Sequence, residues 1–177
     1  DREGNLWVGT RGGGLNQVRA RTLDLINTGL GRPFEAIRSL CEDKSGTIWL
    51  VTQNGSVVRQ QSNEWVALAA ADRWPGGHAA CIAAGAQGGV WIGTRERGLY
   101  FFHTNRFLKW STTNGLGSDA IRSLQVTATG DVWIGTDSPR RLQRLREGEF
   151  LTFALPRQAR SIRAMTEDAA GNIWAAT

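Results

Sequence analysis

The stretch Gly-Asn-Leu-Trp-Val-Gly-Thr occupies residues 4–10, and four close copies of it follow at residues 46–52, 89–94, 130–136 and 171–177. Each copy places a tryptophan three residues before a threonine. The tryptophans are Trp7, Trp49, Trp91, Trp133 and Trp174, so the steps between them are 42, 42, 42 and 41 residues. A period this regular along the whole chain indicates a structural repeat.

Each period contains four short apolar runs separated by turn residues, which predicts consecutive antiparallel strands rather than helices. In the second repeat these runs lie at residues 37–41, 47–51, 56–59 and 65–68, and we name them strands a, b, c and d. The connection from a to b at residues 43–46 and the connection from b to c at residues 53–55 both end on a glycine. Glycine accepts the positive φ that closes a hairpin.

Strand b decides the predicted architecture because both of its faces are apolar. Alternation places Trp7 and Gly9 on one face and Leu6 and Val8 on the other. A single open sheet leaves one of these faces in water, whereas the blades of a β-propeller cover both. The tryptophans are therefore expected in the core between blades, and the small residue two positions later is expected to leave room for the indole.

The predicted fold class is all-β, a β-propeller segment of about four blades with four antiparallel strands per blade and a period of 42 residues. The chain is treated as a single partial propeller with repeats at residues 1–34, 35–77, 78–118, 119–160 and 161–177. It begins and ends inside a repeat, so we expect a segment of a longer protein. Apolar blade faces left uncovered in such a segment favour association, and a homodimer is one expected outcome.

The repeats resemble a known family. The string at residues 42–52, the glycine-rich run at residues 12–15 and the string at residues 114–118 are similar to the two-component regulator propeller repeat. The resemblance implies a seven-bladed ring in a periplasmic sensor ectodomain of bacterial hybrid histidine kinases or membrane-bound diguanylate cyclases. It also implies a ligand, often a carbohydrate, with membrane attachment only through other parts of the parent. The third repeat departs most, because residues 86–89 replace the usual acidic turn.

Composition excludes several classes of protein. The 177 residues are 41% apolar and carry a formal charge of +5. They contain no apolar run long enough to span a membrane. Cys41 and Cys81 lack metal-binding spacing, so buried thiols are expected, with a disulfide as the alternative. The flanking acids and the absence of a recognition motif argue against nucleic acid, although the isoelectric point is about 10.2. We predict no cofactor and no metal.

Catalysis is not expected in this segment. An enzyme needs convergent acid, base or nucleophilic groups, and the two histidines, His78 and His103, fall in connections on opposite rims of the predicted ring. The alternative is an enzyme of the streptogramin lyase type, whose related repeat carries a glutamate after the threonine. Here that position is Arg11, Gln53, Arg95 or Asp137. A protein-binding scaffold is a third possibility.

The charges indicate where a ligand would bind. Successive antiparallel strands reverse direction, so the d–a and b–c connections share one rim, which is rich in arginine, and the opposite rim is rich in acids. Arginine recurs at one register at the entry to strand a, which places it around a common axis. We predict an acidic saccharide or another anion, with binding residues Arg38, Arg122, Arg163, Trp74, His78, Arg95 and Arg140. The alternatives are solvated loop charges and, for Trp74, a hydrophobic plug over a blade end.

Overall fold

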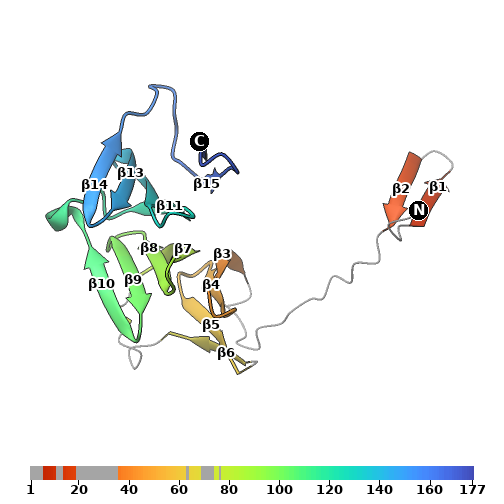
Figure 1. Cartoon of the computed structure of the whole chain (residues 1–177), viewed down its shortest axis with the longest axis horizontal. Helices are drawn as coiled ribbons and strands as arrows, with labels where there is room; N and C mark the ends of the chain where they lie inside the picture. Colours follow the sequence, from red (N-terminus) through yellow and green to blue (C-terminus); the bar gives the residue numbers. More distant parts are fainter. Residues whose placement is uncertain (1–5, 11–13, 19–35, 63, 69–73, 76) are drawn as a thin grey trace.

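The computed structural model describes residues 6–10, 14–18, 36–62, 64–68, 74–75 and 77–177, with only the backbone described at residues 6–18 (Figure 1). Among the described residues the regular elements are β-strands, apart from one turn of 3-10 helix at Thr112–Asn114. No helix in the described part of the chain is long and apolar enough to cross a membrane.

Three four-stranded antiparallel sheets follow one another, each a meander with its strands in chain order. The first contains β3 (Ile37–Glu42), β4 (Ile48–Thr52), β5 (Val57–Gln61) and β6 (Glu64–Ala67). The second contains β7 (Ala79–Ala84), β8 (Val90–Thr94), β9 (Leu99–His103) and β10 (Arg106–Trp110). The third contains β11 (Ile121–Val126), β12 (Val132–Asp137), β13 (Arg140–Arg146) and β14 (Glu149–Phe153). The four strands predicted for the second repeat are thus confirmed to within two residues.

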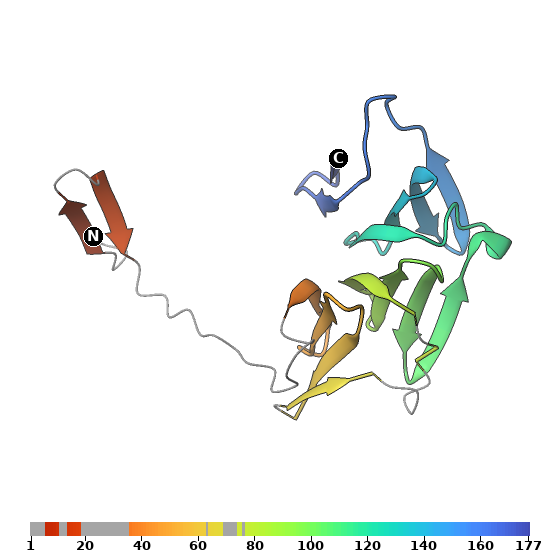
Figure 2. The ribbon, with the colours of Figure 1, turned by 180° about the vertical axis from the view of Figure 1, so that it is seen from behind.

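Two hairpins complete the described strands. One pairs β1 (Leu6–Thr10) with β2 (Gly14–Val18), and the other pairs β15 (Ala164–Glu167) with β16 (Ile173–Ala176). Strand d, the last of the three strands predicted for the first repeat, lies outside the described residues. Figures 1 and 2 show the sheets from β3 to β16 fanned out in an arc, with the strands β3, β7, β11 and β15 on its inner side. The β1–β2 hairpin lies apart from this arc.

Strand b is covered on both faces in the three complete sheets, as its two-sided apolar pattern predicts. Trp49 and Leu50, which point to opposite faces of β4, are both buried, and Val51 and Thr52 are fully buried. The signature threonines Thr52, Thr94 and Thr136 have no exposed surface. Their hydroxyl groups close the b–c turns: Thr94 Oγ1 donates to the Gly98 carbonyl at 2.8 Å and accepts from the Arg97 backbone N–H at 2.9 Å.

The glycine two positions after the tryptophan in the third and fourth repeats makes room for inner strands, which corrects the expectation that it makes room for the indole. A Cβ on Gly93 would lie 2.6 Å from Cγ2 of Ile121, on strand β11 of the following sheet, and 2.7 Å from Sγ of Cys81 on its own sheet. A Cβ on Gly135 would lie 2.5 Å from Oγ of Ser123 on its own sheet and 3.0 Å from Cβ of Ile162, which precedes β15. Real Cβ atoms do not approach this closely, so glycine lets the inner strand of the next sheet press against strand b.

In the second repeat an aspartate side chain stabilises the turn between strands a and b. Asp43 Oδ1 accepts hydrogen bonds from the backbone N–H groups of Ser45 and Thr47, and Asp43 Oδ2 accepts one from Trp49 Nε1 at 2.7 Å. In the fourth repeat Thr127 stands at this position, and its Oγ1 accepts from the Asp131 backbone N–H at 3.0 Å. In the third repeat the residue is Gly85. That turn keeps the two backbone hydrogen bonds of the others, and Gly89 takes a φ of +72°, which only glycine adopts readily.

The signature tryptophans differ in burial, and one expectation is wrong. Trp49 is 4% exposed, and Trp91 and Trp133 are half-buried. Trp174 is 63% exposed, because β15 and β16 have no third strand beside them among the described residues. The Trp7 side chain lies outside the described residues.

Candidate functional site

A repeated β-bulge shapes the inner strands. The pairing of the inner strand with strand b shifts by one residue between Ile37 and Ser39, between Ala79 and Cys81, and between Ile121 and Ser123. The extra residue in each strand is Arg38, Ala80 or Arg122. A bulge re-aims one side chain while the ladder continues on either side. The bulges therefore take these three positions out of the regular pairing at the same end of each inner strand.

A second position lies beside the bulge on the same rim. The residue after the signature threonine donates its backbone N–H to the residue before the inner strand: Gln53 to the Ala36 carbonyl, Arg95 to the His78 carbonyl, and Asp137 to the Ala120 carbonyl. The sheet that has Ala80 at its bulge has Arg95 at this second position. Together with Arg163, which precedes β15, each of the four neighbouring sheets thus contributes one arginine, a regularity that the bulge register alone does not reveal.

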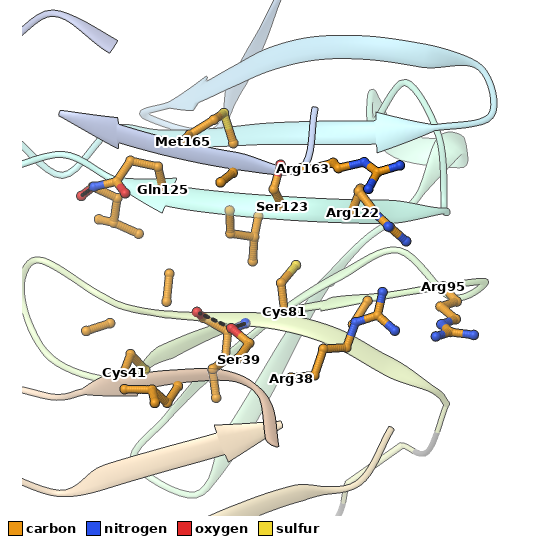
Figure 3. A pocket seen from close by; sticks show the side chains of 18 of the residues that line it. Arg38, Ser39, Cys41, Cys81, Arg95, Arg122, Ser123, Gln125, Arg163 and Met165 are labelled. Carbon is orange, nitrogen blue, oxygen red and sulfur yellow. Dashed lines mark hydrogen bonds between the residues drawn. The ribbon is translucent and has the colours of Figure 1, made fainter. Parts of the chain in front are cut away.

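The four arginines line one pocket of about 840 Å³ between the inner strands. Figure 3 shows Arg38, Arg95, Arg122 and Arg163 gathered at one end of it, with Cys41, Gln125 and Met165 toward the other. The lining also includes small and apolar residues, among them Ala80, Ala83 and Leu124. No carboxylate of the described residues lines this pocket. We call the four arginines the basic mouth.

The positive charges of the basic mouth act on one another. Burial lowers the pKa of the Arg38 guanidinium, and repulsion from Arg95 and Arg122 lowers it further. Arg122 has one partner, because its Nη1 lies 3.8 Å from Asp137 Oδ2. Both side chains are more than one-third exposed, so this ion pair contributes little. The mouth therefore holds an excess of positive charge that an anion would relieve.

Three of the predicted binding residues lie outside the pocket. Trp74 packs edge-on against Tyr100, with ring centroids 5.4 Å apart, and also contacts Phe107. The structure thus gives it the position of a plug beside a core cluster. The ring of His78 lies against the backbone at Gly55. Arg140 is exposed and donates from Nη1 to the Ala159 carbonyl at 3.2 Å.

Two acids, Glu35 and Asp119, stand three residues before Arg38 and Arg122 in the sequence. Glu35 lies outside the described residues, and Asp119 Oδ1 accepts from the Thr112 backbone N–H at 2.9 Å. Asp137 occupies the position next to Arg122. It also lines a smaller pocket of about 280 Å³ that shares Arg38, Arg95 and Arg122 with the larger one.

Nucleophiles and metal ligands are not assembled around the mouth. Cys41 and Cys81 are free thiols, and burial raises the pKa of each to about 12, so both remain protonated at neutral pH. His78 lies beside a b–c turn and His103 beside the a–b turn at Gly88, which are on opposite rims. The described residues contain no group of three metal-ligating side chains.

Comparison with known families identifies the repeats. Residues 31–54 and 115–138 match the model of the two-component regulator propeller family. These segments are two-component regulator propeller repeats. The resemblance seen in the sequence is therefore confirmed. Among curated proteins, no match to the chain is found.

Solved structures with the same fold include sensor domains and a lyase. The extracellular domain of a hybrid two-component system from Bacteroides thetaiotaomicron superposes with a TM-score of 0.70 at 20% identity, over 99% of this chain and 25% of that one. A second such domain from the same organism gives 0.66 at 18% identity, over 99% and 27%. Virginiamycin B lyase from Staphylococcus aureus gives 0.65 at 14% identity, over 79% and 48%.

At these identities the superpositions establish the fold alone. The described strands form three four-stranded antiparallel sheets and two hairpins that resemble propeller blades, and the chain resembles extracellular domains of two-component systems. The chain spans about a quarter of the length of the two sensor structures.

Proposed function

We propose that this chain is a ligand-sensing segment of a periplasmic bacterial receptor and that its basic mouth binds an anion. The observation that carries the proposal is the placement of one arginine by each of four neighbouring sheets at one end of a single pocket. Arginine forks match carboxylate and sulfate groups in shape and charge. An acidic or sulfated saccharide presents such groups in a row and is the ligand that we favour.

The larger architecture belongs to the same proposal. The family repeats and the arc of sheets support a seven-bladed ring in the parent, in which further blades continue the wall of the pocket. The segment then senses, and other domains of the parent produce the output. A homodimer is consistent with the large exposed side chains Leu40 and Trp174.

An enzyme of the lyase type is the second candidate, because virginiamycin B lyase shares the fold. The residues of the basic mouth and the positions of the histidines do not favour a lyase. The residue after the signature threonine is Gln53, Arg95 or Asp137 among the described repeats, and the histidines lie on opposite rims. We therefore favour binding without chemistry.

The test is calorimetric titration of the complete sensor domain with a neutral oligosaccharide and with its uronic-acid counterpart, at low and at high salt. We expect only the acidic ligand to bind, more weakly at high salt. Arg38→Ala should weaken this binding about tenfold or more, because a charge-assisted hydrogen bond is lost. The same change should not lower the melting temperature, because it also removes repulsion inside the mouth.

Arg97→Ala is the matched control. Arg97 lies on the same rim and is exposed, but it donates to the Pro75 carbonyl and does not line the pocket. Equal affinity for the neutral and acidic sugars, or equal losses for Arg38→Ala and Arg97→Ala, would show that the mouth is not the site.

A further inference from the structure

A second pocket lies on the rim opposite the basic mouth, between the second and third four-stranded sheets. It has a volume of about 360 Å³ and shares no lining residue with the pocket of the basic mouth. Its lining comes from the a–b turns of both sheets, from the c–d turn of the third sheet, and from the rings of Trp91 on β8 and Phe101 on β9. Ligand pockets range from about 300 to 1,000 Å³, so this one suits a small ligand.

The strand c residue opposite the tryptophan differs between this sheet and the other two complete sheets. In those two it is an arginine, Arg59 in the first sheet and Arg144 in the third. The Arg59 guanidinium lies over the Trp49 ring, 5.9 Å from its centroid. In the second sheet the residue is Phe101, whose ring centroid lies 4.5 Å from that of Trp91. An aromatic pair thus stands where the other sheets have an indole and a guanidinium.

The a–b turn of the same sheet supplies no side-chain acceptor to the indole. Asp43 and Asp168 accept the indole N–H in their own repeats. Gly85 stands at the equivalent position of the third repeat. Trp91 Nε1 donates to none of the described residues. Because the Trp91 ring is half-buried and lines the pocket, a ligand there can supply the acceptor that its indole N–H lacks.

The charges around the two rings balance. Asp131 and Glu147 bring two negative charges to the lining, and Arg146 brings one positive charge. Asp131 is 13% exposed at its side chain, and it is paired with Arg146 at 3.6 Å and with Arg144 at 3.7 Å. Gln87 adds an uncharged amide from the a–b turn. The pocket therefore favours an uncharged ligand, in contrast to the basic mouth.

We propose that this pocket binds an uncharged heteroaromatic ring whose ring nitrogen or carbonyl oxygen accepts from Trp91 Nε1. A flat ring packs against Trp91 and Phe101 in the tilted, offset manner in which these two rings already pack on each other. A sugar ring carries hydroxyl groups on all sides, and those facing the aromatic rings would lose their hydrogen bonds to water. The site is separate from the basic mouth and does not rest on the anion proposed there.

The first test is saturation-transfer difference NMR of the whole protein, with nicotinamide, adenine and uracil as probes and glucose as the non-aromatic control. Binding in the millimolar range is expected, because a single small ring makes few contacts. At least one of the aromatic probes should show transfer, and glucose should show none. No transfer to any aromatic probe, or equal transfer to glucose, overturns the proposal.

The second test restores the arginine of the other sheets. Phe101→Arg places a guanidinium over the Trp91 ring and should weaken probe binding about tenfold or more, because the aromatic pair is lost. Leu108→Arg is the matched control. It adds the same charge on the outer strand of the same sheet, at a side chain that is 56% exposed and outside the pocket. Equal binding by these two variants overturns the proposal.

A third variant keeps the test decisive if Phe101→Arg does not fold. Gln87 is exposed and its side chain has no hydrogen bond to the described residues, so Gln87→Ala should leave the melting temperature unchanged. It should weaken probe binding about two- to tenfold, the value of one hydrogen bond. Arg38→Ala, in the basic mouth, should leave binding of these probes unchanged. Full binding by Gln87→Ala, or loss of binding in Arg38→Ala, places the probe elsewhere and overturns the proposal.

Discussion

Trp49 and Trp174 have the same sequence motif and the same turn, yet one is buried and the other is in water. Both indole N–H groups donate to the aspartate six residues earlier, Trp49 to Asp43 at 2.7 Å and Trp174 to Asp168 at 2.8 Å. Their turns share the same backbone hydrogen bonds. Their exposures are 4% and 63%. The difference teaches that the turn is a local structure encoded by one repeat, whereas burial requires the neighbouring strands and sheets.

The largest effect expected from this comparison is the loss of the buried indole. Trp49→Ala should lower the free energy of unfolding by about 3 to 5 kcal/mol, because it leaves a cavity beside Phe102 and removes a large buried side chain. Trp174→Ala should cost less than about 1 kcal/mol, since its ring is already in water. Denaturant unfolding of the two variants measures both. Equal losses would mean that Trp174 is buried in solution.

A smaller effect is expected at the acid of the turn. Asp43→Ala leaves Trp49 Nε1 without its partner at a buried site, and we expect a loss of about 1 to 2 kcal/mol. Asp168→Ala is the matched variant. Its effect should be the smaller of the two, because water can replace the carboxylate at the exposed Trp174. Denaturant midpoints give the ranking, and the reverse order would contradict the role of burial.

The smallest effect is expected at low pH, where protonation of Asp43 and Asp168 weakens their hydrogen bonds to the two indoles. At Asp43, burial acts to raise the pKa, but hydrogen bonds from Ser45, Trp49 and Thr47 together lower it. At Asp168, hydrogen bonds from Trp174 and then Asn172 lower the pKa to about 2. A lowered carboxyl pKa means that the stabilisation is complete above the unfolded value of about 3.9 and is lost as the pH falls through the folded value.

Indole N–H resonances followed during acidification measure this effect. The Trp174 signal should titrate with a midpoint near 2, and the Trp49 signal with a midpoint below 3.9. A Trp174 midpoint near 4 would show that its hydrogen bond does not form in solution.

Most of the fold is predictable from the sequence, because residues close together in the chain determine each strand and turn. The tryptophan period, the alternation in strand b and the turn glycines gave strand positions within two residues in the second repeat. The sequence did not predict which atoms meet between one sheet and the inner strand of the next. The role of Gly93 depends on Ile121, which lies 28 residues away, and no local pattern reveals that contact.

The candidate site was only partly predictable for the same reason. Arg38, Arg122 and Arg163 share a register, so their convergence follows from the repeat. Arg95 was expected on the same rim, but only the structure shows that it takes the place left by Ala80. Trp74 lies among turn residues, which favoured a ligand-stacking role, and its contacts with Tyr100 and Phe107 arise from tertiary packing that its neighbours in sequence do not encode.

The β-bulge at Arg38, Ala80 and Arg122 has an evolutionary consequence. The serine that follows the bulged arginine ties neighbouring sheets together: Ser39 Oγ accepts from the Ile82 backbone N–H, and Ser123 Oγ donates to the Ile162 carbonyl. The bulged residue itself carries none of these duties, so arginine and alanine interchange there among the repeats. A lineage of such repeats can therefore change the charge of the mouth by one codon per repeat while the scaffold stays the same.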